Sequence, residues 1–137
     1  MSAPPSILNL ALPEFSAELV SAGEKKFRAA QIFEAIFKRG STRFDGVKAV
    51  PAALRDKLNE KYSIFTSEVE KRVSDCEGNT KFLLRLSDNL RVECVLMAES
   101  GRPVVCLSTQ VGCPIACAFC ASGRVGFVRN LTAGEIV

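Results

Sequence analysis

The first sixty residues carry apolar side chains at helical spacing. Between Phe27 and Gly40 the apolar positions recur every three or four residues, at Phe27, Ala30, Phe33, Ile36 and Phe37. This period predicts an amphipathic helix with these side chains as its apolar face. Lys38 and Arg39 complement the negative end of the helix dipole, and Gly40 can take the left-handed conformation that follows a helix end.

Two further helices are predicted on either side of this one. The first runs from about Pro13 to Ser21. The second begins at Pro51, whose missing amide hydrogen costs nothing in a first turn, and ends near Lys61. Residues 1–65 are therefore expected to form a small helical module.

After Tyr62 the pattern changes to that of strands. Segments 80–86 and 90–98 are rich in Val, Leu and Phe, and the Ser-Asp-Asn between them is a turn cluster, so the two predict a β-hairpin. A third strand, 103–109, leads directly into a cysteine-rich loop. We expect residues 66–100 to form a hairpin extension, and residues 101–137 to begin a further domain.

Alternation along the strands assigns side chains to faces of the expected sheet. Glu93 shares a face with Arg91 and Val95, and Cys106 shares a face with Ser108, because alternate residues of a strand point the same way. Glu93 carries a carboxylate and Cys106 carries a thiol, and the two predicted strands that hold them follow one another in the sequence.

The last residues carry a helix start. Thr132 and Glu135 form a Thr-x-x-Glu capping box, in which both side chains satisfy backbone amides at the beginning of a helix. The order strand, cysteine loop, helix start is one opening unit of a βα architecture, and a single unit cannot cover a parallel sheet. The fold class is thus α+β, with an incomplete βα part and an exposed parallel edge near 103–109.

Composition limits where the protein acts. The 137 residues are 47% hydrophobic, enough for one ordinary domain or for a small domain and part of another. The longest apolar stretches are too short to cross a bilayer, and the first residues lack the features of a signal peptide. We therefore expect a cytoplasmic protein without a membrane partner, in which six cysteines are ligands, reactive thiols or buried side chains rather than a disulfide framework.

The net charge of +3 is unevenly spread. Between Lys25 and Lys57 there are nine basic residues against three acidic ones. Such a patch can meet the phosphates of a nucleic acid, but on charge alone it is more typical of a solvated helix face.

The cysteine-rich loop holds the most specific pattern. Cys113, Cys117 and Cys120 form Cys-x3-Cys-x2-Cys, with no fourth cysteine after them. Three thiolates on one short loop leave one iron of a four-iron cluster open to a small ligand. Structural zinc is an alternative, but it takes four Cys or His ligands and the chain has no histidine. Unpaired thiols are the third reading of this pattern.

The sequence around the triad resembles a known family. The matching stretches are CLSTQVGC from Cys106, FCASG from Phe119 and GFVRNLTAGEIV from Gly126, with upstream likeness over 77–86, 92–96 and 27–33. The triad alone is typical of radical S-adenosylmethionine (SAM) enzymes. Together with the Gly-Phe-x-Arg-Asn-Leu-Thr stretch it is similar to the RNA adenine carbon-2 methyltransferases of the RlmN and Cfr type, whose amino-terminal part aligns with nearly the whole chain.

The resemblance implies the start of a radical SAM (βα) barrel and a specific chemistry. Cys113, Cys117 and Cys120 would hold a [4Fe-4S] cluster whose open iron binds SAM, and one electron would cleave SAM to a 5'-deoxyadenosyl radical. In the family, that radical activates a methylated cysteine, which adds to carbon 2 of an adenine in large-subunit rRNA or tRNA. Flavodoxin is the type of electron donor implied, and the full-length enzyme would be a monomer.

Release of the RNA from this adduct requires a base and a second thiol. By position, Glu93 resembles the family's proton acceptor, and Cys106 resembles the thiol that forms a transient disulfide with the methylated cysteine. A positioned carboxylate can accept a proton and a thiolate attacks sulfur readily, so both residue types suit these roles. Without the resemblance, Glu93 would be taken as a surface residue and Cys106 as a small buried side chain.

Neighbouring residues carry weaker expectations. Phe119 would shield the cluster or pack in the core, and Arg124 and Arg129 would contact SAM or RNA phosphate or serve a structural role. Three glycines are expected to permit tight backbone turns around the loop, namely Gly112, Gly123 and Gly126. Cys76 and Cys94 match no functional role.

The resemblance covers only an amino-terminal portion. The methyl-carrying cysteine and most of the barrel have no counterpart in these residues, so we expect this chain alone to be inactive. A non-catalytic iron-sulfur or metal-binding RNA-binding module and a different radical SAM enzyme are the alternatives. The sequence does not specify which adenine is modified, nor whether carbon 2 or carbon 8 is the target.

Overall fold

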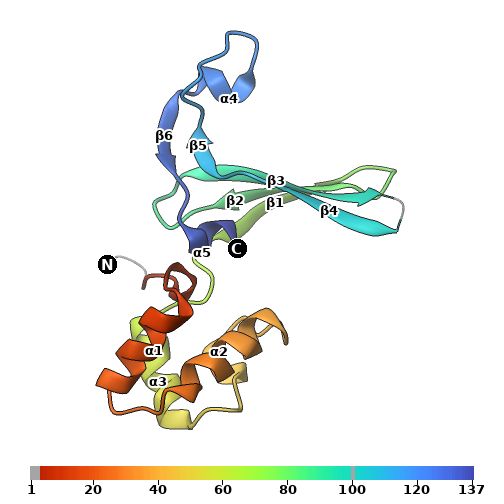
Figure 1. Ribbon diagram of the computed structural model, residues 1–137. Helices are drawn as coiled ribbons and strands as arrows, with labels where there is room; N and C mark the ends of the chain where they lie inside the picture. Colours follow the sequence, from red (N-terminus) through yellow and green to blue (C-terminus); the bar gives the residue numbers. More distant parts are fainter. Residues whose placement is uncertain (1–3, 100) are drawn as a thin grey trace. The chain divides into compact units, whose positions relative to one another are not determined.

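The computed structural model describes residues 4–99 and 101–137, which form two compact units. The first unit is Met1–Thr66 and the second is Ser67–Val137. In Figure 1 the first unit holds α1, α2 and α3, and the second holds all the labelled strands. Among the described residues, no helix has the length and apolar character needed to span a membrane.

The first unit is helical, as its pattern predicts. Its elements, in chain order, are η1 (Ile7–Asn9), α1 (Leu12–Ser21), α2 (Phe27–Phe37), η2 (Phe44–Gly46) and α3 (Ala52–Lys61). Pro51 stands as the N-cap of α3, so the predicted start is correct to one residue. Gly40 has a φ of 65°, which confirms its predicted role beyond the end of α2.

The core of this unit is aromatic and aliphatic. Phe15 of α1 is fully buried, and its ring meets those of Phe33 and Tyr62 edge-on at centroid distances of 5.7 and 6.4 Å. The carboxylate of Glu18 accepts hydrogen bonds from the Tyr62 hydroxyl at 2.6 Å and from Lys61 Nζ at 2.7 Å. These contacts join α1 to the end of α3, and the bonds from both partners lower the pKa of Glu18.

The apolar face of α2 differs from the predicted one. The buried residues of this helix are Ala29, Ile32, Ala35 and Ile36, whereas Phe27 and Phe37 are about half exposed. Of the predicted stripe, only Ile36 is buried, and Phe33 packs against the core while partly exposed. The cause is that α2 is apolar around most of its circumference, so spacing alone does not select the buried side, and the small alanines allow close packing.

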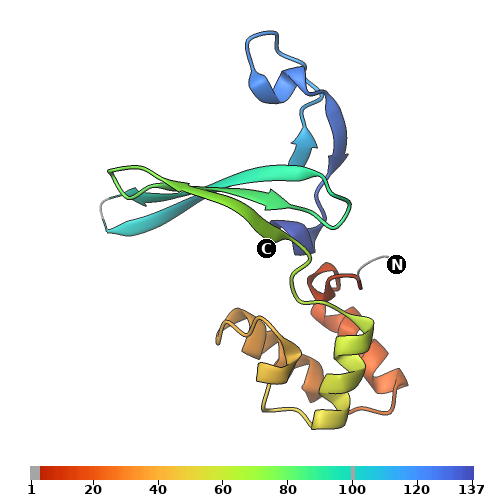
Figure 2. The same cartoon turned by 180° about the vertical axis from the view of Figure 1, so that it is seen from behind.

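The second unit is built on an antiparallel sheet. Its strands are β1 (Glu68–Ser74), β2 (Thr80–Arg85), β3 (Arg91–Glu99) and β4 (Arg102–Leu107), hydrogen-bonded in the order β1-β2-β3-β4. Strands β2 and β3 form the predicted hairpin. Strand β1 has no counterpart in the sequence prediction, and all of its residues are exposed. Figure 2 shows the four strands as one twisted sheet.

The strand before the cysteine loop pairs differently from the prediction. Strand β4 is antiparallel to β3, with Val95 opposite Cys106 and Leu96 opposite Val105. The expected opening strand of a parallel sheet is therefore an edge strand of an antiparallel one. The short connection explains this, because a parallel pair needs a crossover of a dozen or more residues, whereas neighbouring antiparallel strands need only a hairpin turn.

The remaining residues form a smaller ladder. Strands β5 (Gln110–Gly112) and β6 (Phe127–Asn130) pair antiparallel, with α4 (Ala121–Arg124) between them and α5 (Ala133–Ile136) after them. Thr132 and Glu135 form the predicted capping box at the start of α5. A second core holds this ladder to the sheet, and its buried members are Leu86, Val92, Val111 and Leu131.

Candidate functional site

The three triad cysteines lie on one loop that the β5–β6 ladder closes. Gly112 pairs with Phe127, and the Cys113 amide donates to the Gly126 carbonyl at 3.2 Å. The loop with α4 lies at the end of this ladder away from α5 (Figures 1 and 2). Both ends of the loop are thus fixed by backbone pairing next to Cys113.

Glycines are required at the two narrow points of this loop. Gly112 has a φ of 74°, and a Cβ atom there would lie 1.6 Å from the Gly126 carbonyl oxygen. A Cβ atom at Gly123 would lie 2.8 Å from the Cys117 amide nitrogen. Gly126 has a φ of 79°, so the predicted tight turns are confirmed at Gly112 and Gly126, whereas Gly123 lies in α4 and permits close approach to Cys117.

Each triad cysteine is half-buried with a free thiol. The Cys120 amide donates to the Cys117 carbonyl at 3.1 Å, and Cys120 is the N-cap residue of α4. Hydrogen bonds from the Gly123 and Ser122 amides hold the pKa of the Cys120 thiol below its ordinary value. A thiolate is the form that binds metal, so this environment suits a ligand.

The thiols themselves do not converge in this structure. Across residues 4–99 and 101–137, no group of three or more Cys, His, Asp or Glu side chains is placed to hold a metal ion. What the fold provides is three thiols on one closed loop in a chain without histidine. That donor set fits an iron-sulfur cluster better than zinc, because zinc sites take four ligands.

Glu93 and Cys106 lie on one face of the four-stranded sheet. Val95 is opposite Cys106, and Glu93 is two residues from Val95, so Glu93 and Cys106 are diagonal neighbours on this face. Glu93 is paired with Lys81, whose Nζ lies 3.1 Å from Oε1. Ser108 Oγ donates to the Glu93 backbone carbonyl at 2.7 Å and extends the β3–β4 pairing beyond Leu107.

A pocket of about 330 Å³ lies between Glu93 and the cysteine loop. Its lining combines the start of β3, strand β5 and the region of α4, with Arg91, Val92, Glu93, Ser108, Gln110, Val111, Gly112, Ala121, Ser122 and Val125. Sequence reasoning did not single out Gln110 or Ser122. Gln110 stands within the CLSTQVGC match and Ser122 within the FCASG match, so position in the motifs was the available signal.

Of the other candidate residues, Phe119 and Arg124 are exposed, and Arg129 is held in ion pairs. Phe119 is 94% exposed, so it neither packs in a core nor covers another group in this structure. The Arg129 guanidinium forms ion pairs with Glu135 at 2.9 Å and with Asp88 at 2.7 Å, which gives it the structural role among its predicted alternatives. Arg124 is exposed at the end of α4.

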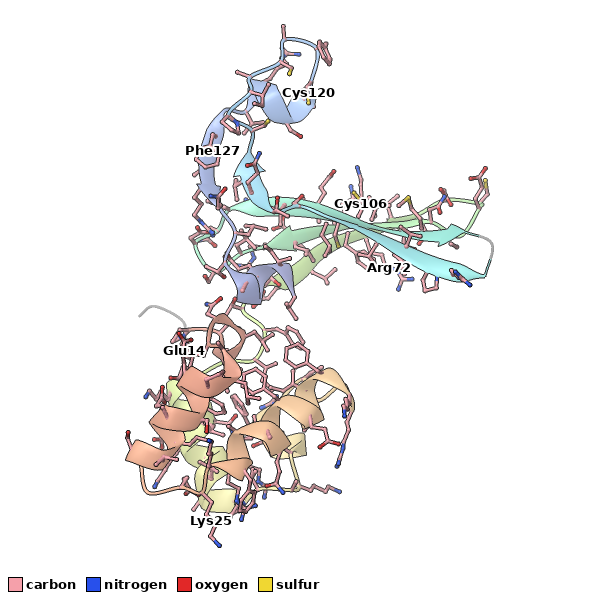
Figure 3. The ribbon with its side chains drawn as sticks, in the orientation of Figure 1. Glu14, Lys25, Arg72, Cys106, Cys120 and Phe127 are labelled. Carbon is pink, nitrogen blue, oxygen red and sulfur yellow. The ribbon has the colours of Figure 1, made fainter. Side chains whose placement is uncertain are left out.

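The remaining cysteines differ in accessibility. Cys106 is exposed, in contrast to the small buried side chain expected without the family resemblance (Figure 3). Cys94 is half-buried, and burial, followed by the neighbouring Cys106 thiol, raises its pKa. Cys76 is exposed in the turn between β1 and β2. Of these three thiols, Cys106 is the exposed one on the face of Glu93.

The basic patch of the helical unit is mostly free of acidic partners. Arg39 and Arg43 make the two ion pairs of this segment, at 3.5 Å to Glu34 and 3.7 Å to Asp45. Arg28 and Arg55 instead donate to backbone carbonyls. The lysines of the patch are exposed, namely Lys25, Lys26, Lys38, Lys48 and Lys57.

The fold is similar to that of part of a solved structure. A crystal structure described as a radical SAM methyltransferase from Sphaerobacter thermophilus matches it with a TM-score of 0.91 and 35% sequence identity. The match covers 97% of this chain and 39% of that one. The helices and antiparallel sheet therefore match those of part of that structure.

The sequence comparisons name the family. Residues 6–64 match the family model described as the ribosomal RNA large subunit methyltransferase N-terminal domain. A relative in Thermotoga neapolitana named "Probable dual-specificity RNA methyltransferase RlmN" is 44% identical over 133 residues. A relative of the same name in Pelodictyon phaeoclathratiforme is 45% identical over 136 residues. The chain is therefore similar to the amino-terminal part of proteins named RlmN.

The match covers nearly all of this chain but less than half of each relative. It covers 96% of this chain but 39% of the Thermotoga neapolitana relative and 38% of the Pelodictyon phaeoclathratiforme relative. The chain thus spans less than half the length of these relatives.

Proposed function

We propose that the chain is the amino-terminal part of a SAM-dependent methyltransferase that modifies carbon 2 of an adenine in large-subunit rRNA and in tRNA. The observation that carries the proposal is the arrangement of Glu93 and Cys106 as diagonal neighbours on one sheet face, beside a pocket that reaches the cysteine loop. The family relationship supplies the reaction, since the relatives are named as RNA methyltransferases.

In this proposal Cys113, Cys117 and Cys120 hold a [4Fe-4S] cluster that also binds SAM. When bound, the cluster supplies the electron that cleaves SAM. The chain's own contribution is the loop: backbone pairing fixes its ends, and amide hydrogen bonds favour the thiolate of Cys120.

Glu93 and Cys106 act after the adenine has been joined to a methylated cysteine. Once the adduct has lost its unpaired electron, Glu93 would accept the proton of carbon 2, and the thiolate of Cys106 would attack the sulfur of the methylated cysteine. The sulfur–methylene bond breaks as the transient disulfide forms, and the released methylene carbon takes up a proton to become the methyl group of the RNA. The exposure of Cys106 supports this role, because the incoming sulfur must reach it.

The helical unit is the proposed RNA-docking module. Exposed lysines without acidic partners provide the charge that phosphates require. An RNA substrate agrees with a cytoplasmic enzyme that receives electrons from a flavodoxin-type donor. Because the methylated cysteine has no counterpart in these residues, we propose that the chain alone does not methylate RNA.

Anaerobic reconstitution with iron and sulfide tests the cluster. We expect the chain to bind about four irons with the absorption and EPR spectra of a [4Fe-4S] cluster. Replacing Cys113, Cys117 or Cys120 with Ser is expected to abolish this uptake, whereas Cys76→Ser retains it. A colourless protein that holds zinc, or equal loss of iron from Cys76→Ser, would rule the assignment out.

A further inference from the structure

Lys81 is a charged side chain that the proposed reaction leaves without a role. It lies on β2 directly opposite Val95, which is itself opposite Cys106 on the next strand. Cross-strand partners share a face of a sheet. Lys81 therefore lies on the same face as Glu93 and Cys106.

Lys81 is the basic residue of β2 and β3 that pairs with Glu93. Lys81 Nζ lies 3.1 Å from Glu93 Oε1, and among the ion pairs of the described residues it is the one that Glu93 makes. The other cations of β2 and β3 are engaged elsewhere, since Arg85 pairs with Glu68 and Arg91 pairs with Glu70 at 3.0 Å. Glu93 has one cation to orient its carboxylate.

The pair is too exposed to serve mainly the stability of the sheet. The side chains of Lys81 and Glu93 are 52% and 54% exposed, and exposed ion pairs contribute little to folding. Its effect is instead geometric. An ammonium group bound to Oε1 limits the rotamers of the carboxylate and leaves Oε2 as a free acceptor.

The backbone of Glu93 is held as well. Ser108 Oγ donates to the Glu93 carbonyl at 2.7 Å, so this residue is fixed to β4 through its main chain and to β2 through its side chain. Glu93 also lines the pocket that reaches the cysteine loop. A base has to be held within hydrogen-bond reach of the proton it accepts, and both contacts meet that need.

We propose that Lys81 is a positioning residue, which holds the Glu93 carboxylate at the pocket on the face that carries Cys106. The inference rests on the proposed function, in which Glu93 is the proton acceptor. In that step the C–H bond of the base breaks, an O–H bond forms on Glu93, and the bonding electron pair stays on the ring. Lys81 touches neither the RNA base nor the proton, and acts through the placement of Glu93.

The position of the carboxylate is measured first in the 137-residue chain by NMR. We expect a nuclear Overhauser contact between Lys81 Hε and Glu93 Hγ, and two separate Hγ signals for Glu93 because its rotamer is fixed. In Lys81→Met the Hγ signals merge, and in Lys81→Arg they stay separate. Lys71→Met is the matched control. Lys71 lies on β1 opposite Leu83, and Leu83 lies opposite Glu93 on β3, but Lys71 makes no ion pair with Glu93. A parent chain without the contact, or merging in Lys71→Met, overturns the proposal.

The consequence for the reaction is measured in a complete enzyme, made by joining residues 1–137 to the remaining part of the Thermotoga neapolitana relative and selected for formation of 2-methyladenosine. We expect Lys81→Met to lower kcat about 10- to 100-fold, with KM for RNA within about twofold and more RNA covalently trapped on the enzyme. Lys81→Arg restores most of kcat, and Lys71→Met resembles the parent. If Glu93→Gln traps RNA but Lys81→Met turns over normally, the positioning role is wrong while the proposed function stands. If Glu93→Gln itself turns over normally, the proposed function of Glu93 fails.

Discussion

Arg129 shows how one side chain fixes the segment that follows the cysteine loop. Its guanidinium binds both oxygens of Glu135 at 2.9 Å and also contacts Asp88 in the β2–β3 turn. The sequence placed Arg129 among candidate contacts for SAM or phosphate. The presence of an arginine next to a binding loop does not specify which group its guanidinium binds. Its acidic partners lie 41 residues before it and 6 after it, so only the fold could identify them.

The same ion pair predicts a dependence of stability on pH. Hydrogen bonding to Arg129 is the main cause that lowers the pKa of Glu135 in the folded state, below its ordinary value of 4.5. The stabilisation is therefore complete above that value and is lost as the pH falls through the lower, folded-state pKa. Arg129→Met should lower the free energy of unfolding of the second unit by about 1–3 kcal/mol at pH 7.

This is measured by urea unfolding at pH 7 and at pH 3. The difference between parent and Arg129→Met should shrink at pH 3, because below pH 4.5 the unfolded chain takes up a proton on Glu135 and the stabilisation from the paired carboxylate falls. Arg102→Met, on the edge strand β4, is the control and should change the unfolding free energy by less than about 0.5 kcal/mol. An equal loss at both pH values would mean that packing of the Arg129 stem, not charge, holds the ladder.

At the scale of elements, the sequence predicted where the helices and the hairpin lie but not which surfaces meet. Caps and turn residues act locally, so the ends of α2, α3 and α5 could be read from Gly40, Pro51 and Thr132. Strand β1 was missed because it has no buried face, and its place depends on pairing with β2. For the site, the loop turns were accessible from the glycines of the sequence, whereas the shared face of Glu93 and Cys106 and the pairing of Glu93 with Lys81 depended on strand register.

The difference between the predicted and the observed buried face of α2 can be tested directly. Ile32 is fully buried and Phe37 is 56% exposed, although the predicted apolar stripe included Phe37 and omitted Ile32. Ile32→Ala should lower the free energy of unfolding of the helical unit by about 2–4 kcal/mol, because it removes buried methyl groups and leaves a cavity.

The matched variant Phe37→Ala should cost less than about 1 kcal/mol, mainly the stacking on Phe33. Both are measured by chemical denaturation with circular dichroism at 222 nm. A larger cost for Phe37→Ala than for Ile32→Ala would show that the predicted stripe, not the observed one, faces the core.

At the scale of the whole molecule, the two units have separate cores. Among residues 4–99 and 101–137, the first unit buries fifteen hydrophobic residues in one cluster, and the second buries four in another. Most of the four-stranded sheet is exposed, with β1 and β4 exposed along their length. The helical unit should therefore be the more stable of the two, because burial of apolar surface is the main source of stability.

Separate unfolding of the two units follows from this. In thermal unfolding of the 137-residue chain we expect two transitions, with loss of the strand signal before loss of the helix signal. Residues 1–66 expressed alone should keep a cooperative helical transition at a midpoint within about 5 °C of the second one. A single transition common to both signals, or an unfolded 1–66 segment, would show that the units depend on each other.

The two edges of the sheet differ in a way that sets the direction in which it can grow. Strand β1 presents charged side chains of both signs between its exposed valines, with Glu68, Glu70 and Lys71, whereas β4 presents Val104 and Val105 after Pro103. Charged edges resist a further strand and apolar ones accept it, although the missing amide hydrogen of Pro103 removes one donor from that edge. An added strand, from this or another chain, would meet charged side chains beside β1 and mainly apolar ones beside β4. The sheet is therefore expected to pair with a further strand at its β4 edge rather than at its β1 edge.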